Sequence, residues 1–428
     1  MASTAPKIAA MRRNIGLYPW YAGLFNAFFW MPVFFLYFGK HLTLGEVLGL
    51  EAVYYGAVVV LEVPSGYFSD AVGRRTTLLV SAVCLVSAYV LFFVGDSFSA
   101  FATAQVVLAG GIAFNSGTDT SFHYDSLASL DRAEEYEDRE AIAARNALFA
   151  TGVAALAGGA IAAVELRFAY GLSAVFAAAT LVLVLFFREP LAHEASADVT
   201  GEATDDETSD ETGASEALGF GPQLLACLAY LKQPALAWLF ALAVLMTVLN
   251  HIPYEFYQPY LELVGGDIDW LDQTPLATGA HMFAATMLAA WVAARSATID
   301  ARLGKGPTLL LAAGIQTAII ATMALVLHPL VAVLLLLRGV PGAMFKAPLL
   351  AAVTPRISLG QRATYLSVQS LAGRLGFALF LGGLSYVAGA ATIDDWTTLS
   401  HLLWLGAAVG VVGVVVLAVA LVRVELER

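Results

Sequence analysis

The sequence predicts an all-α membrane protein with twelve transmembrane helices in two bundles of six. The 428 residues are 59% hydrophobic and only 13% charged, with a mean hydropathy of +0.75, whereas about a quarter of the residues in a soluble domain are charged. Apolar stretches of helical length recur along the whole chain, and each is close to the ~20 residues that a membrane span needs. A polar segment in the middle separates six of these stretches from the other six.

The spans of the first half are predicted at 15–38, 46–67, 76–95, 100–121, 142–164 and 168–187. Those of the second half are predicted at 235–255, 275–296, 306–327, 329–351, 362–388 and 399–423. The expected domains are therefore a bundle over residues 1–190 and a bundle over residues 221–428. Residues 191–220 between them are rich in Asp, Glu, Thr and Ser, a composition that cannot bury enough apolar surface to fold and predicts a flexible cytoplasmic linker.

The basic residues predict how the chain lies in the membrane. With a cytoplasmic N-terminus, the loops that carry most Lys and Arg residues face inward, and only Lys40 and Arg167 fall in outer loops. This is the positive-inside pattern, and twelve spans then bring both termini to the cytoplasm. We expect a multi-pass protein of a prokaryotic plasma membrane. The net charge of −12, with 17 Arg against 5 Lys, further suggests a halophilic source.

Several classes of protein are disfavoured. Cys84 and Cys227 both lie in apolar segments without a CxxC pair, so neither a disulfide nor a metal site is expected. The chain has no phosphate-binding loop, dinucleotide fingerprint, GxSxG or HExxH motif, which argues against an enzyme and against a cofactor. It also has no basic face for nucleic acid.

A charged turn connects the second and third predicted spans. It has the sequence Gly66-Tyr-Phe-Ser-Asp70-Ala-Val-Gly73-Arg74-Arg75. The glycines permit a tight backbone, and the arginines follow the inside bias. A carboxylate at the membrane edge is stabilised by a cation or by a helix N-terminus, so Asp70 is expected to have such a partner.

This turn resembles the signature between helices 2 and 3 of the major facilitator superfamily, although Ala71 stands where that pattern usually has a basic residue. The resemblance implies two six-helix bundles and makes Gly66, Asp70, Gly73, Arg74, Arg75 and Asp125 a gating motif. In the family the equivalent carboxylate latches the cytoplasmic bundle ends, near the start of helix 11 (here 361–364), and the first arginine pairs with an acid closing helix 4, for which Asp125 is the candidate.

A weaker echo of the turn follows the eighth span, with Asp300, Gly304 and Lys305 in similar order. It indicates either duplicated halves, as in many transporters, or a chance similarity.

A second stretch, from Asn115 to Leu127, resembles a branch of the superfamily whose substrates are mostly undefined. Glu62, Gly66 and Asp70 share one helix face by their spacing. Glu62 and Asp119 are the candidates for proton coupling, and Glu62 has the alternative of pairing with an inner arginine.

Two arginines, Arg338 and Arg374, are predicted near the bilayer midplane, where charged residues are costly and suggest function. They favour either contact with an anion or a structural role that fastens helices. The other cavity candidates are polar or aromatic residues of spans 1, 2 and 7, in the last of which Pro253 is expected to interrupt the helix: Asn26, Trp30, Tyr54, Asn250, His251, Tyr254 and Glu255.

These features predict a secondary transporter that moves a small organic solute, with an anionic solute favoured, by rocking alternating access. The expected partners are the substrate, a coupling ion (proton or sodium) and the lipid bilayer, and a monomer is expected. The alternatives are a proton-coupled multidrug efflux antiporter and a membrane sensor that does not transport.

Overall fold

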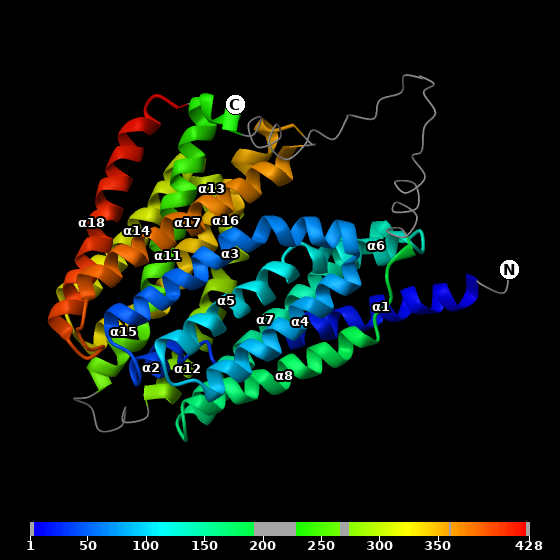
Figure 1. Ribbon diagram of the computed structural model, residues 1–428. Coiled ribbons are helices and arrows are strands. Elements are labelled where there is room, and N and C mark those ends of the chain that lie inside the picture. The colour runs from blue at the N-terminus through cyan, green and yellow to red at the C-terminus, as the bar shows by residue number, and fades with distance from the viewer. Residues whose placement is uncertain (1–3, 192–227, 266–273, 359–360, 425–428) are drawn as a thin grey trace. The chain divides into compact units, whose positions relative to one another are not determined.

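The computed structural model describes residues 4–191, 228–265, 274–358 and 361–424 (Figure 1). Within these ranges every regular element is a helix and no strand is present. Eleven of the described helical stretches are long and apolar enough to cross a membrane. The predicted all-α membrane fold is thus confirmed. Of the linker predicted at 191–220, residues 192–220 lie outside the described residues.

Up to residue 191, the helices are α1 (Thr4–Phe25), α2 (Phe34–Gly39), α3 (Leu44–Val72), α4 (Arg74–Val94), α5 (Phe98–Asn115), α6 (Thr118–Ala128), α7 (Tyr136–Ala162) and α8 (Arg167–Leu185). From residue 228 onward, they are α11 (Pro234–Gly265), α12 (Thr274–Ala293), α13 (Ser296–Leu303), α14 (Lys305–Leu325), α15 (Pro329–Leu334), α16 (Val340–Val353), α17 (Arg362–Ala388) and α18 (Trp396–Leu421). A 3₁₀ segment, Leu335–Gly339, joins α15 to α16.

The chain forms two compact units. The first unit contains Met1–Trp30, Ala57–Ala154 and Arg167–Ala217, and the second contains Met31–Gly56, Ala155–Leu166 and Leu218–Arg428. Helices α3 and α7 therefore each begin in one unit and end in the other. The domain boundaries expected at 190 and 220 stay a prediction, because these units are defined by packing and combine segments from both halves of the sequence.

In the first unit, α4 packs against both α5 and α8. The ring of Phe92 on α4 lies 6.3 Å from that of Phe101 on α5 and 4.9 Å from that of Tyr170 on α8. About three turns earlier in α4, the Ser81 hydroxyl donates a 2.6 Å hydrogen bond to the carbonyl oxygen of Gly111, where α5 approaches α4 closely. Aromatic packing and a close backbone approach thus join these three helices.

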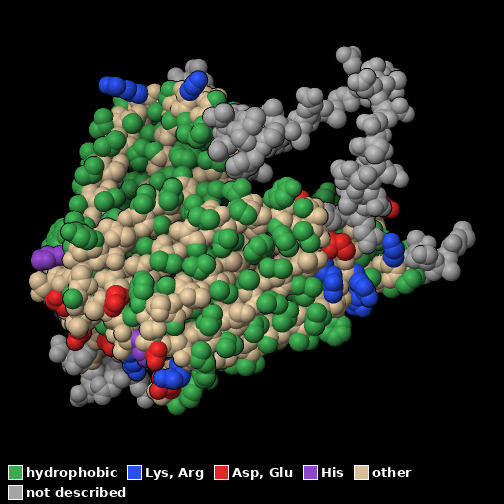
Figure 2. All heavy atoms as spheres, in the orientation of Figure 1, with side chains coloured by type: hydrophobic (Ala, Val, Ile, Leu, Met, Phe, Trp, Pro, Cys, Tyr) green, Lys and Arg blue, Asp and Glu red, His purple; other side chains and the backbone are tan. Residues whose placement is uncertain are grey.

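Helix α8 shows how the surface is divided. It buries the small or polar residues Ser173, Ala177 and Thr180, while Val175 and Val182 are more than half exposed. Figure 2 shows the same tendency over the visible face, where hydrophobic side chains dominate and charged ones gather in a few groups. Small residues inside and large apolar residues outside are what helix packing in lipid favours.

The first predicted span, 15–38, is wrong as a single helix. Helix α1 ends at Phe25 and α2 begins only at Phe34. The side chain of Asn26 donates to the carbonyl oxygen of Ala22 at 2.9 Å, and Pro32 restricts the residue before it and lacks an N–H. Irregular backbone at membrane depth needs protein partners, and Gln258 of α11 supplies two: it accepts from the N–H of Phe35 at 2.9 Å and donates to the carbonyl oxygen of Met31 at 3.1 Å.

Two close approaches hold segments of the first half of the sequence in the second unit. A β-carbon on Gly159 of α7 would lie 2.9 Å from the Cα atom of Gly279 on α12. At the start of α3, a β-carbon on Gly45 would clash with the carbonyl oxygen of Gly389, and the Ser385 hydroxyl donates to the carbonyl oxygen of Gly45 at 2.7 Å. Backbone contact of this kind requires residues without side chains.

The charged turn at Gly73 and the similar turn at Gly304 have a similar backbone arrangement. Gly73, with φ +109°, separates α3 from α4, and Gly304, with φ +81°, separates α13 from α14. In both cases the next helix starts at a basic residue, Arg74 or Lys305. This shared helix–glycine–basic residue pattern is what a duplicated half would produce.

Candidate functional site

Helix α11 carries four of the nine predicted cavity residues. The expectation that Pro253 interrupts this span is wrong, because α11 runs unbroken through Pro253 and Pro259 to Gly265. Prolines are tolerated in membrane helices when side chains satisfy the freed backbone groups. One turn earlier, Nδ1 of His251 lies 2.6 Å from the carbonyl oxygen of Thr247. The helix therefore presents Asn250, His251 and Glu255 on a continuous element.

Glu255 is wholly buried, and neither of its carboxylate oxygens has a well-formed hydrogen bond to a described residue. Tyr55 of α3 brings a hydroxyl close by, and Glu51 of the same helix, itself 6% exposed, lies within electrostatic range. Tyr254 interacts with both carboxyl groups and with Tyr54. Two acids from different helices thus lie within electrostatic range of each other among tyrosine side chains of the second unit.

His251 connects this group of acids and tyrosines to α17. Its ring lies 5.3 Å from that of Tyr55 and 4.8 Å from that of Phe377. The Arg374 guanidinium on α17 is within electrostatic range of His251. The structure therefore brings Tyr54, His251, Tyr254, Glu255 and Arg374 into one interior region of the second unit, which we call the α3–α11–α17 cluster, with Glu51 and Tyr55 as further members.

Arg338 lies in the 3₁₀ segment between α15 and α16 and is 8% exposed. Its Nη1 atom donates to Nδ1 of His281 at 2.6 Å and to the carbonyl oxygen of Leu335 at 3.2 Å. The guanidinium carbon sits 4.0 Å from the centre of the Tyr257 ring. Of the described residues, none places a carboxylate within ion-pair distance of it. The cation is held by neutral partners.

The predicted residue Asn250 lies beside α16, the helix that follows Arg338. A β-carbon on Gly342 of α16 would come 3.1 Å from its amide nitrogen. The amide oxygen of Asn250 is buried and has no hydrogen-bond partner in the described part of the chain. A polar atom left in this way marks a place where a ligand or water can bind.

In the charged turn, Arg74 contacts two acids, one of which, Asp125, is the partner that the resemblance implies. Its Nη1 lies 2.5 Å from Asp70 and its Nε 3.4 Å from Asp125. Nη1 also donates to the Ser69 hydroxyl at 2.9 Å. The Asp70 side chain is 70% exposed. The contact between Arg74 and Asp125 is therefore present, and the gating role of the motif stays a prediction.

Glu189, which sequence reasoning missed, holds the other side of the turn. Its two carboxylate oxygens accept the backbone N–H groups of Arg74 at 2.7 Å and Arg75 at 3.0 Å, at the start of α4. Unpaired N–H groups and the helix dipole favour an anion there. A β-carbon on Gly73 would lie 2.9 Å from that carboxyl group, so Gly73 meets both a conformational and a steric demand.

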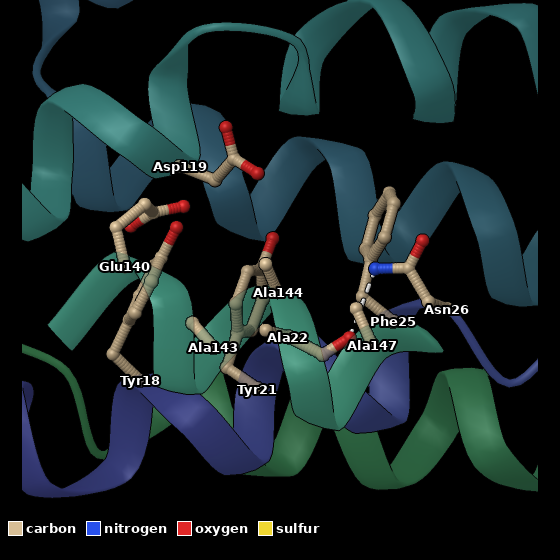
Figure 3. Close-up of a pocket in the computed structure, with 10 residues that line it drawn as sticks. All are labelled: Tyr18, Tyr21, Ala22, Phe25, Asn26, Asp119, Glu140, Ala143, Ala144 and Ala147. Carbon is tan, nitrogen blue, oxygen red and sulfur yellow. Dashed lines mark hydrogen bonds between the residues drawn. The ribbon is translucent and has the colours of Figure 1, made fainter. Parts of the chain in front are cut away.

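Asn26 and Asp119 line a pocket of about 90 Å³ in the first unit, between α1, α6 and α7 (Figure 3). Asn115 donates to Asp119 at 3.1 Å and accepts from the Tyr21 hydroxyl. Glu140 of α7, which the sequence did not single out, lines the same pocket and pairs with Nδ1 of His123 at 2.8 Å. The pocket therefore combines two carboxylates with tyrosine and alanine side chains.

The remaining candidates lie elsewhere. Trp30 stacks on Tyr170 with ring centres 6.0 Å apart and planes 11° apart, within an aromatic group of the first unit. Glu62 is half-buried on α3, on the same helix as Gly66. Among the described residues no cluster of three or more His, Cys, Asp or Glu side chains could hold a metal ion.

A family model described as Major Facilitator Superfamily matches residues 20–381. No curated protein sequence matches the chain.

Several solved transporter structures have a similar fold. A mutant of the nucleoside transporter NupG has a TM-score of 0.75 at 13% identity, covering 95% of this chain and 99% of the other. A mutant of the peptide transporter POT has a TM-score of 0.66 at 12% identity, covering 96% and 94%. A D-xylose–proton symporter has a TM-score of 0.65 at 13% identity, covering 94% and 96%. At these identities the likeness shows a common fold.

Proposed function

Because the chain belongs to the Major Facilitator Superfamily, we propose that it is a secondary active transporter that moves a small organic solute by alternating access. It is a membrane-embedded transporter, not an enzyme. The single observation that carries the proposed mechanism is the composition of the second unit. There, segments 31–56 and 155–166 of the first half pack on helices of the second half.

These contacts have the properties of a gate that can separate. Some of them, at Gly45, Gly159 and Gly279, are made by backbone and small residues, and surfaces of this kind can separate and meet again without large side chains having to repack. With the predicted orientation they lie at the outer end of the spans. We infer that they close the outer side in this state and open when the transporter faces outward.

The gate can be locked to test this proposal. A β-carbon on Gly49 would lie 3.8 Å from that of Ser385, and about 3.8 Å is the usual separation in a disulfide. The pair Gly49→Cys and Ser385→Cys, with Cys84 and Cys227 replaced by alanine, should therefore cross-link on oxidation. Counterflow in proteoliposomes would be measured with labelled amines, organic acids, sugars and nucleosides.

Oxidation should abolish counterflow and a reductant should restore it, while each single-cysteine variant stays active. Full counterflow by cross-linked protein would contradict the proposed gate. Binding of a solute without counterflow in the reduced protein would favour the sensor alternative.

Arg338 was one reason to expect an anionic substrate. Its guanidinium is occupied by His281, Leu335 and the Tyr257 ring. This arrangement supports the fastening role for Arg338. Contact with an anion then depends on Arg374, in the α3–α11–α17 cluster.

A second candidate function, proton-coupled antiport, is supported by Glu255. An ionised carboxylate buried without a cation or hydrogen bonds is costly by several kcal/mol. Glu255 in this state is therefore expected to hold a proton, and to release it when the cluster is hydrated. The titratable groups within electrostatic range of it are Glu51 and Tyr55 from α3 and Tyr254 and Tyr257 on its own helix.

Glu255→Gln tests proton coupling. Under this proposal the variant exchanges solute in counterflow but loses accumulation driven by a pH gradient. Glu262→Gln, an acid on the same helix, is the matched control. Gradient-driven accumulation equal to wild type in Glu255→Gln would exclude Glu255 as the coupling group.

We place both termini in the cytoplasm of a prokaryotic cell, propose that the chain works as a monomer, and keep sodium as the alternative coupling ion. The positive-inside distribution of Lys and Arg supports the orientation, and the acidic composition supports a halophilic source.

A further inference from the structure

We propose that the pocket between α1, α6 and α7 binds the ammonium group of a small organic amine. This inference rests on the proposed transport function, because it names a chemical group that the transported solute would carry. The pocket volume is about 90 Å³. Since an apolar cavity of about 150 Å³ holds benzene, this pocket fits an ammonium group with about two or three carbon atoms.

The two acidic side chains of the pocket, Asp119 and Glu140, favour a cationic ligand. Among the described residues no Lys or Arg side chain lies within ion-pair distance of Asp119, which receives only neutral donors, from the Asn115 side chain at 3.1 Å and the Thr120 N–H at 2.8 Å. Glu140 has His123 as its partner at 2.8 Å. The Nε2 atom of His123 is buried and has no hydrogen-bond partner among the described residues. Two carboxylates therefore face the same space without a permanent cation.

A third group points to a ligand. The side chain of Tyr18 is only 2% exposed, yet no described residue forms a hydrogen bond with its hydroxyl group. Its ring is fixed by stacking on His123, with the ring centres 3.9 Å apart. Figure 3 shows this hydroxyl directed to the same space as the carboxylates of Asp119 and Glu140. A buried polar group in this position is expected to have a partner, and an ammonium group can donate to all three.

The other end of the pocket defines the rest of the ligand. Ala22, Phe25 and Ala147 line it with carbon atoms, and Asn26 contributes the one amide there. A fully hydrated metal ion would leave these apolar walls unused, whereas a short alkyl chain covers them. The aromatic rings of Tyr18 and Tyr21 also favour an organic cation. The expected ligand class is thus a small primary amine.

The test is binding to the purified full-length protein, followed by thermal unfolding and calorimetric titration. Propylammonium chloride is the probe, with propan-1-ol as the neutral analogue of similar shape and sodium chloride at matched ionic strength. We expect a saturable shift with propylammonium alone. Asp119→Asn and Glu140→Gln should each weaken its binding about tenfold, equivalent to about 1.4 kcal/mol, and Tyr18→Phe should weaken it by a smaller factor.

Glu137→Gln is the matched control, because it removes the same charge from an exposed position of α7 three residues before Glu140. It should bind propylammonium as wild type does. Equal shifts with propylammonium and propan-1-ol, a shift reproduced by sodium alone, or unchanged binding in both Asp119→Asn and Glu140→Gln would overturn the inference. The comparison of ligands on wild-type protein decides the matter even if a variant fails to fold.

This experiment separates the two proposals. If propylammonium does not bind specifically but the Gly49–Ser385 disulfide still controls counterflow, the transport proposal holds and only the proposed substrate class is wrong. Binding of the amine by a protein that shows no counterflow would preserve the site and contradict transport.

Discussion

Arg338 donates a hydrogen bond to Nδ1 of His281, and Nε2 of the same ring lies 2.9 Å from the carbonyl oxygen of Ala332. A guanidinium has no acceptor, so Nδ1 must accept and Nε2 must carry the proton. His281 is therefore a neutral ring in one tautomer, and it links α12 to the irregular segment that contains Arg338.

His281→Ala should lower the stability of the protein by about 2 kcal/mol, because a hydrogen bond to a buried charged group is lost. His281→Gln should lose less, since its amide supplies both an acceptor and a donor. The measurement is thermal or denaturant unfolding in detergent. The control is His401→Ala, an exposed histidine on α18, and a loss as large as that of His281→Ala in this control would refute the assignment.

Gly159→Ala should destabilise the protein, because its new β-carbon would lie 2.5 Å from the carbonyl oxygen of Pro275 and 2.9 Å from the Cα atom of Gly279. Overpacking of this kind costs about 1–3 kcal/mol. Gly383→Ala is the control, since nothing lies within 4 Å of its β-carbon position in α17, and alanine is favoured over glycine inside a helix. The two unfolding temperatures should therefore move in opposite directions, and equal shifts would argue against a close crossing at Gly159.

Asp395 gives a pH-dependent contribution to stability. It caps α18 by accepting the Thr398 hydroxyl at 2.6 Å and the N–H groups of Thr397 and Thr398 at 3.0 and 3.3 Å. These bonds, led by that from the Thr398 side chain, lower the pKa of Asp395 below its ordinary value. Because the folded-state pKa is lowered, the contribution is present above the unfolded-state pKa and is lost as the pH falls through the folded-state value.

Asp395→Ala should therefore lower the unfolding temperature at neutral pH, and its difference from wild type should shrink as the solution becomes strongly acidic. Asp394→Ala is the neighbouring control, which should leave the unfolding temperature near that of wild type. A deficit in Asp395→Ala that does not change with pH would show that the carboxylate charge plays no part in the cap.

The sequence predicts the fold well because lipid imposes a severe rule: each span must be apolar over about 20 residues and must satisfy its own backbone. The prediction from sequence fails where side chains from distant parts of the chain satisfy the backbone groups instead. Gln258 supplies the backbone partners that allow the break between α1 and α2. Proline alone likewise proved a poor guide, since α11 continues through Pro253.

The candidate sites were predicted less completely. Arg74 and Asp125 could be paired because the resemblance implied it, and Glu255 was found as a rare acid in an apolar span. Glu189, Glu140 and His281 were missed because their partners lie far away in the sequence. The one local signal for Glu189 was its position directly before Pro190, at the inner end of a predicted span.

The most direct test of alternating access is the accessibility of one half-buried position from each side of the membrane. The variant is Tyr254→Cys, in the α3–α11–α17 cluster, made in a protein whose Cys84 and Cys227 are alanine. A membrane-impermeant maleimide is then applied to intact cells and to inside-out vesicles. Alternating access predicts that the introduced thiol is labelled from both sides, because the cluster faces each side in turn. Labelling from one side only, at every pH and with every solute tried, would contradict it.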